Sequence, residues 1–321
     1  MEKHIICSGC SFTRQFKRIG IDGTDLDFLD DAEYFWRWPH HLQIAYPDSI
    51  VYNLGNPTND NQVIAFSIIN KVSELLKKGI PSSDIRVIVQ WSDSNRKSFF
   101  ISDKISKEYN SNLKYQDLNE NAYAHVSAFL DNVDESIGNS GYFIQSGGYS
   151  YRHVPYNVVD VFDKMGHYLS TENSTIEYFK NILLLQNYLK LKNIDFFQFN
   201  LSVNFNPASG AFTFSDIYYD KKIIKSFFNN FYINPYIQFL YEQIDMDKMW
   251  LFNDESTDNG GILEWSIKNF ELSIDKKLFM EHEFIDLNEF IKSKSIDDYA
   301  FGHPSSEMNH KFVEKIIKKS L

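Results

Sequence analysis

Short apolar runs occur at intervals along the N-terminal part of the chain and predict the strands of a sheet. They span residues 4–7, 49–54 and 84–91, and polar or glycine-containing segments follow each of them. The third run contains the unbroken sequence Val87-Ile88-Val89, which is typical of a strand that is buried on both faces.

The segments between these runs have the periodicity of helices. Apolar residues at Val63, Phe66, Ile69 and Val72 predict a buried stripe on a helix that ends near residue 78, with Asn59 or Asp60 as its N-cap (residues 59–60). The aromatic stretch 34–45 predicts a helix interrupted at Pro39. Alternation of strand and helix favours a parallel α/β sheet.

After residue 96 the alternation stops and then resumes. Residues 97–170 are rich in Asn, Ser, Asp and Tyr, and we interpret them as an insertion. A helix is expected to begin at Thr171 or Ser174 and to end near residue 192, followed by a strand at 195–201. We expect a single domain over residues 1–321, with insertions at about 97–170 and 202–245.

The C-terminal part is expected to complete the sheet and its helical layers. Residues 221–243 predict an aromatic helical region broken near Pro235, and residues 284–287 predict a short fifth strand. Ser305 or Ser306 is expected to cap a final helix. The buried stripe predicted for that helix consists of Phe312, Val313, Ile316 and Ile317.

Composition and charge exclude several classes of protein. The chain has 321 residues, of which 43% are hydrophobic, and a chain of this length buries about 75% of its unfolded surface, so general disorder is excluded. The net charge of −11, without a basic patch, argues against a nucleic-acid partner. No apolar run is long enough for a membrane span or a signal peptide. Synthesis in the cytoplasm is expected.

The only two cysteines, Cys7 and Cys10, form a C-x-x-C pair. This spacing occurs in redox centres and in half of a zinc site. No second pair is present to complete a zinc site, and two cysteines do not make a disulfide scaffold. We therefore expect two structural thiols, no metal and no organic cofactor.

Four polar clusters are expected at or near the carboxyl ends of the strands, where doubly wound sheets bind ligands. Each has an ordinary structural interpretation: a helix cap for residues 9–12, a tight turn for 53–61, a polar loop for 90–96, and for 302–306 a loop histidine that binds a backbone carbonyl. Each also offers groups useful in catalysis: a hydroxyl, a close-approaching glycine N–H, amide donors and an imidazole. The clusters are residues 9–12, 53–61, 90–96 and 302–306.

The order of these clusters resembles the SGNH (GDSL) hydrolase superfamily. The similarity rests on Gly-Cys-Ser-Phe-Thr at 9–13, Asn-Leu-Gly at 53–55, Val-Gln-Trp-Ser at 89–92 and His-Pro at 303–304, and it is closest to a branch frequent in bacteriophage genomes. It implies a three-layer α/β/α, flavodoxin-like fold with a central parallel sheet. It also implies a serine esterase in which Ser11 is the nucleophile, His303 is the general base, and the N–H groups of Ser11 and Gly55 stabilise an oxyanion.

Three features depart from the pattern of that family, and the first is Cys10, which stands where the family has an Asp beside the nucleophile. Ala300 stands where the family has an acid, so Asp298, Asp297, Glu307 or a backbone carbonyl is left to orient His303; Asp298 is the candidate we adopt. The family's Gly-x-Asn-Asp block is missing as well. We expect Asn61, Ser92 or Asn95 to replace its amide donor.

The expected substrate is an ester, most simply an O-acyl group on a carbohydrate. Because the acid and amide positions are altered, the alternative is a protein that keeps the scaffold without turnover. Such a protein would serve as a binding or structural component of a phage virion, with phage structural proteins as partners, or in host recognition. A flavodoxin-like nucleotide-binding domain is a weaker interpretation, since no glycine-rich phosphate loop follows the first strand.

Overall fold

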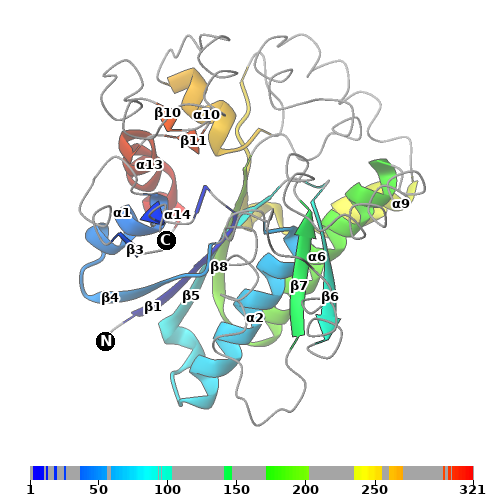
Figure 1. Cartoon of the computed structure of the whole chain (residues 1–321), viewed down its shortest axis with the longest axis horizontal. Helices are drawn as coiled ribbons and strands as arrows, with labels where there is room; N and C mark the ends of the chain where they lie inside the picture. The colour runs from blue at the N-terminus through cyan, green and yellow to red at the C-terminus, as the bar shows by residue number, and fades with distance from the viewer. Residues whose placement is uncertain are drawn as a thin grey trace.

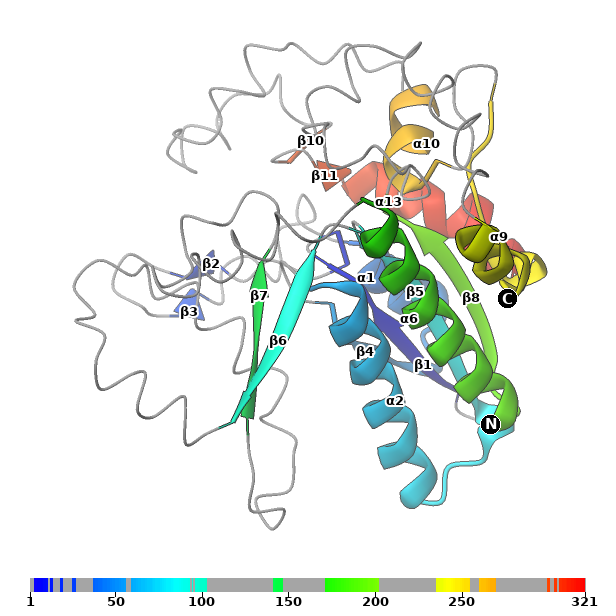
Figure 2. The same ribbon diagram turned by 90° about the vertical axis from the view of Figure 1, so that its right-hand side faces the viewer.

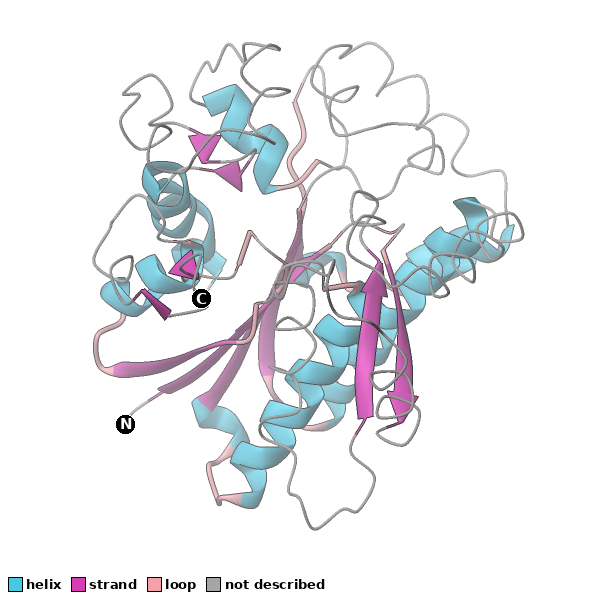
Figure 3. Ribbon diagram, viewed as in Figure 1, coloured by secondary structure: helices cyan, strands magenta, loops and turns pink. Residues whose placement is uncertain are grey.

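The computed structural model describes a little more than half of the chain, drawn in colour in Figure 3. Ser11, Asn95 and Asp298 lie outside the described residues, as does the side chain of His303. The predicted strand at 284–287 and the helical stretch 221–234 lie outside them as well. The described residues are 3–10, 12–13, 18–19, 25–26, 37–55, 59–92, 94, 96–102, 141–146, 171–201, 235–254, 260–269, 299–300, 303–304 and 306–320.

A five-stranded parallel sheet forms the centre of the molecule, with the strand order β4-β1-β5-β8-β9 (Figure 1). After β1, the next strand of this sheet along the chain, β4, lies on one side of β1, and the later strands β5, β8 and β9 lie on the other side. The order therefore reverses between β1 and β5, and in doubly wound sheets such a reversal marks the ligand-binding edge. The strands are β1 (Lys3–Ser8), β4 (Ser49–Asn53), β5 (Ile85–Trp91), β8 (Asp195–Asn200) and β9 (Met249–Trp250).

Helices cover both faces of this sheet and make three layers (Figures 1 and 2). One face is covered by α2 (Asn61–Lys77), α6 (Thr171–Leu191) and α9 (Pro235–Glu242). The other face is covered by α1 (Trp38–Ala45), α10 (Ile262–Asn269) and the C-terminal helix, which consists of α13 (Ser306–Phe312), the π-helical turn η11 (Val313–Ile317) and α14 (Lys318–Ser320).

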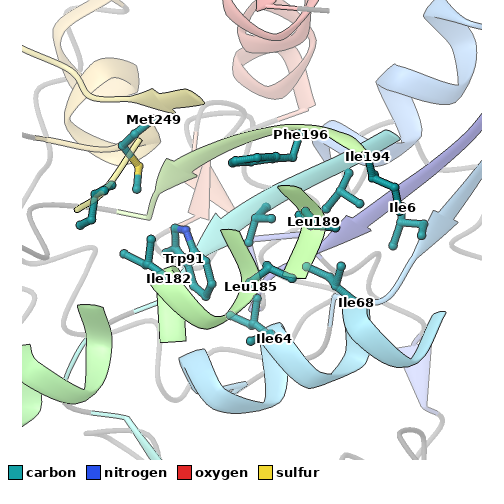
Figure 4. Packing of buried hydrophobic residues seen from close by; sticks show 14 of the residues in the cluster. Ile6, Ile64, Ile68, Trp91, Ile182, Leu185, Leu189, Ile194, Phe196 and Met249 are labelled. Atoms are coloured by element: carbon teal, nitrogen blue, oxygen red, sulfur yellow. The ribbon is translucent and has the colours of Figure 1, made fainter. Parts of the chain in front are cut away.

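Successive side chains of the strands point to opposite faces of the sheet and contribute to two separate apolar clusters. Ile6 of β1 points toward α2 and α6, while Ile5 and Cys7 point toward α1 and α13. In the first cluster, shown in Figure 4, side chains of α2 and α6 such as Ile64 and Leu185 pack on the sheet. Because both faces are apolar, the central strands are continuous hydrophobic runs, as the sequence predicts.

Four predicted strands and three predicted helices are confirmed, with boundaries shifted by a few residues. The helix predicted to follow Asn59 or Asp60 is α2, and its N-cap is Asp60, whose Oδ1 accepts from the N–H of Val63 at 2.9 Å. The final helix begins at Ser306, and the predicted residues Phe312, Val313 and Ile317 are fully buried, whereas Ile316 is half-buried.

Two details of the helix predictions are wrong. Of the predicted stripe, Val63 and Val72 are fully buried, but Phe66 and Ile69 are only half-buried, since the buried face of α2 also contains Ile64, Ile68 and Leu75. Apolar residues occupy most of this helix, so periodicity alone does not fix which face meets the sheet. Pro39 does not interrupt a helix either. It lies in the first turn of α1, where a proline leaves no hydrogen bond unmade.

Several elements have no counterpart in the sequence analysis. The fifth strand of the sheet is β9, which is only two residues long, and α10 follows it. Within the first predicted insertion, β6 (Lys97–Ser102) and β7 (Gly141–Ser146) pair antiparallel beside α2 (Figure 1). Short pairs also join β2 (Arg18–Ile19) with β3 (Asp25–Leu26), and β10 (Tyr299–Ala300) with β11 (His303–Pro304). Within the described residues, no helix combines the length and apolar character needed to cross a membrane.

Candidate functional site

The loop that follows β1 is held by buried polar contacts on both sides of Ser11. The N–H of Thr13 donates to the carbonyl of Cys10 at 2.9 Å, and the Thr13 hydroxyl donates to Gln90 Oε1 of β5 at 2.5 Å. The other end of the same amide, Gln90 Nε2, lies 3.6 Å from Cys10 Sγ. All three side chains are fully buried, so the residues flanking Ser11 are fixed to the carboxyl end of β5.

Gly9 is required by the closeness of this packing. A Cβ atom at position 9 would lie 2.1 Å from Thr13 Oγ1 and 2.8 Å from Gln90 Oε1. Both atoms belong to the hydrogen bond just described, so any larger residue must break it. The glycine two positions before the candidate nucleophile therefore permits the close approach of the side chains around it.

The carboxyl end of β4 reaches the same loop through Asn53. Its Nδ2 donates to the carbonyl of Thr13 at 3.0 Å, and its Oδ1 accepts from the N–H of Gly55, also at 3.0 Å. Asn53 thus joins the predicted oxyanion donor, Gly55, to the loop that contains Ser11. Since the Gly55 N–H already has this acceptor, an oxyanion would have to share or displace the Asn53 oxygen.

The start of α2 adds two buried amides. Asn59 Nδ2 donates to the carbonyl of Gly9 at 3.1 Å. Asn61 makes a two-point contact with the backbone of Ser92: its Nδ2 donates to the Ser92 carbonyl at 3.2 Å, and its Oδ1 accepts from the Ser92 N–H at 2.8 Å. Two predicted site residues, Asn61 and Ser92, are therefore brought together, and the side-chain amide of Asn61 holds the loop after β5 in position.

The His303–Pro304 strand is attached to the same region through α1. The Pro304 carbonyl accepts from Arg37 Nη1 at 2.7 Å and from Asn309 Nδ2 at 2.9 Å. Asn309 Oδ1 accepts from the backbone N–H of Trp38 at 3.2 Å, and the Trp38 indole donates to Thr13 Oγ1 at 3.2 Å. A chain of hydrogen bonds thus connects the residue after His303 with a residue two positions from Ser11.

Arg37 is the buried cation of this region. It is 1% exposed, and burial lowers the pKa of its guanidinium to about 10, although the nearby Cys10 acts in the opposite direction. The group therefore remains charged at neutral pH. Cys7 and Cys10 are both free thiols packed in the second apolar cluster, and burial raises the pKa of Cys7 well above its ordinary value.

Sequence reasoning missed the parts played by Arg37, Trp38, Thr13 and Asn309. One signal was available, because Arg37 precedes a Trp-Pro pair in a chain with few arginines. Asn309 gave a weaker one, as an amide between the buried Met308 and Phe312 of the final helix. Among the described residues, no group of three or more His, Cys, Asp or Glu side chains is placed to bind a metal ion.

Comparison of the chain with protein-family models, with curated proteins and with solved structures gives no match in any of the three. The site must therefore be interpreted from its own residues. These residues form a buried, mostly neutral polar framework around the loop after β1, and the guanidinium groups of Arg37 and Arg96 lie beside it.

Proposed function

We propose that this chain is a serine hydrolase of the SGNH type, with a flavodoxin-like three-layer fold, that cleaves an ester. Ser11 is the nucleophile and His303 is the general base. Asp298 is the candidate for orienting His303, and the N–H groups of Ser11 and Gly55 face the developing oxyanion. Asn61, Ser92 and Asn95 are the candidates for the remaining polar contacts to it. The proposed substrate is an O-acyl group on a carbohydrate.

The reaction would follow the two steps of acyl transfer. Ser11 Oγ attacks the acyl carbonyl while His303 accepts its proton, and His303 then gives that proton to the departing alcohol. A water molecule, deprotonated by His303, next attacks the acyl-enzyme. The products are the free acid and the restored serine. Side-chain hydroxyls are weak nucleophiles at neutral pH, which is why the base must lie within hydrogen-bond reach.

One observation supports this proposal above the others. The hydrogen-bond chain Thr13–Trp38–Asn309–Pro304 joins segments separated by some 290 positions in the sequence at the edge where such sheets bind ligands. This shared network would hold the loop after β1 and the His-Pro strand in fixed positions, which the proposed reaction requires.

The test is covalent labelling with a fluorophosphonate, which transfers its phosphonyl group to an activated serine and releases fluoride. We expect the label on the peptide containing Ser11 and none on Ser11→Ala. Ser83→Ala is the matched control, because Ser83 is an exposed serine just before β5, at the opposite end of the sheet. Hydrolysis of acetyl esters and of O-acetylated polysaccharide should fall at least about 10³-fold in Ser11→Ala and in His303→Ala.

Labelling that persists in Ser11→Ala would assign the activity to another residue. A folded wild-type protein that neither reacts with the probe nor hydrolyses any ester of the panel would contradict the proposal. That result would favour the alternative of a binding or structural protein on the same scaffold.

A further inference from the structure

The carbonyl of Pro304 is held by two buried donors that come from different helices. Arg37 Nη1, at the N-terminus of α1, lies 2.7 Å from it, and Asn309 Nδ2, on α13, lies 2.9 Å from it. Arg37 is 1% exposed and Asn309 is 0% exposed. A carbonyl oxygen has two lone pairs, so this pair of donors fills its hydrogen-bonding capacity.

Such a contact fixes the backbone on the C-terminal side of His303. The proline already restricts His303 to extended backbone conformations. His303 also lies in β11, which pairs antiparallel with β10 in the register Ala300↔His303. Because the Pro304 carbonyl is held as well, rotation of the peptide that follows Pro304 is restricted. The backbone of His303 is therefore constrained on both sides, and its ring moves mainly through the side-chain torsions.

The same two residues face the loop that contains the proposed nucleophile. Arg37 lies near Cys10, the residue before Ser11. Asn309 binds the backbone N–H of Trp38, whose indole donates to Thr13. The contacts of Arg37 and Asn309 therefore reach both strand ends, one beside His303 and one beside Ser11.

We propose that Arg37 and Asn309 are positioning residues that act together as a clamp on the Pro304 carbonyl and so set the place of His303 relative to Ser11. The structural part of this inference, the fixed position of His303, rests on the two hydrogen bonds. The catalytic part, the effect on the reaction of Ser11, rests on the proposed function. A displacement of about 1 Å in a catalytic group lowers a rate by about 10²-fold. Loss of either donor should have an effect of that order on the reaction of Ser11.

The experiment measures the second-order rate of fluorophosphonate labelling in Arg37→Met and Asn309→Asp. Arg37→Met keeps the length of the side chain but removes the donor. Asn309→Asp keeps the oxygen that accepts from Trp38 and removes the N–H that Pro304 needs. We expect a decrease of about 100-fold in each and less than the product of the two in the double variant, because both act on one carbonyl. Arg37→Lys, which retains a donor, should recover at least about tenfold.

His41→Leu is the matched control for a merely structural effect. His41 Nε2 lies 3.0 Å from Ser306 Oγ, so this variant also removes a hydrogen bond between α1 and α13, and it leaves the Pro304 carbonyl untouched. Its labelling rate should stay within about threefold of wild type even where thermal unfolding shows equal destabilisation. If His41→Leu slows labelling as much as Arg37→Met does, or if Arg37→Lys recovers nothing, the clamp is rejected.

A second measurement keeps the clamp testable without activity. The 13Cε1 resonance of the His303 ring, assigned by its loss in His303→Gln, should be narrow in wild type and should shift or broaden in Arg37→Met and Asn309→Asp but not in His41→Leu. If wild type fails to label at Ser11 while the resonance responds in this way, the hydrolase proposal is lost and the clamp stands. A resonance unchanged in both variants overturns the clamp whatever the labelling shows.

Discussion

The two ends of the central sheet use polar side chains in opposite ways. At the amino ends of the strands, the polar side chains form ion pairs in which at least one partner is solvent-accessible: Lys3 with the buried Asp84 at 2.8 Å, and Asp195 with both Arg86 at 2.9 Å and Lys248 at 2.7 Å. At the carboxyl ends, most of the polar groups among the described residues are buried amides and hydroxyls, and the charged groups beside them include the buried Arg37 and Asp60.

This difference indicates which end is specialised. A surface ion pair is worth less than about 1 kcal/mol and can be replaced, because water solvates its members when they part. A buried amide must be hydrogen-bonded or it costs about 1–3 kcal/mol. A chain that buries Gln90, Asn59, Asn61 and Asn309 at one edge therefore fixes the geometry there far more strictly than at the other.

The largest expected effect comes from crowding the carboxyl end. Gly9→Ala should lower the free energy of unfolding by about 3 kcal/mol, because its Cβ would displace the Thr13–Gln90 hydrogen bond in a close-packed region. Gly79→Ala is the comparison, since its Cβ meets nothing within 4 Å and only the positive φ of 82° opposes it, at a cost of about 1 kcal/mol. Chemical denaturation measures both, and equal losses would mean that Thr13 and Gln90 can move aside to accept a Cβ at position 9.

A smaller effect is expected from protonation of His41. Burial, reinforced by the nearby His310 and His40 and opposed by the Ser306 backbone, lowers the pKa of His41 from 6.5 to about 4. Between these pH values the unfolded chain binds a proton that the folded protein does not, so stability falls as pH is lowered from 6.5 to 4. The loss should be about 2 kcal/mol, and the difference from His41→Leu in denaturation at pH 7 and pH 4.5 isolates it. A difference between the two proteins that does not change with pH would show that His41 titrates normally.

The smallest effect is expected at the amino ends. Arg86→Met removes one partner of Asp195 but leaves Lys248, so the free energy of unfolding should fall by less than about 1 kcal/mol. The difference should shrink further in 1 M salt, where exposed charges are screened. A loss as large as that of Gly9→Ala would remove the contrast between the two ends.

The sequence predicted four of the five strands of the sheet because each of these has a recognisable local pattern. Residues 4–7, 49–54, 84–91 and 195–201 are apolar runs with polar ends, and the helix after Asp60 has both its cap and its period. The two-residue strand β9 has no such signal, since two residues show no alternation. It pairs with Gln198 and Phe199 of β8, and only the edge that β8 offers makes it a strand.

For the site, the sequence determined which groups are available at the carboxyl ends of the strands, because a strand's end is set by local pattern. It also determined that an imidazole stands before a proline, with an extended backbone. Only the tertiary structure decided that Asn61 binds Ser92, that Asn53 holds Gly55, and that Arg37 and Asn309 meet at Pro304. These contacts join residues whose partners are chosen by the packing of whole helices on a sheet, and hydrogen-bond partners distant in the chain leave no periodic trace in it.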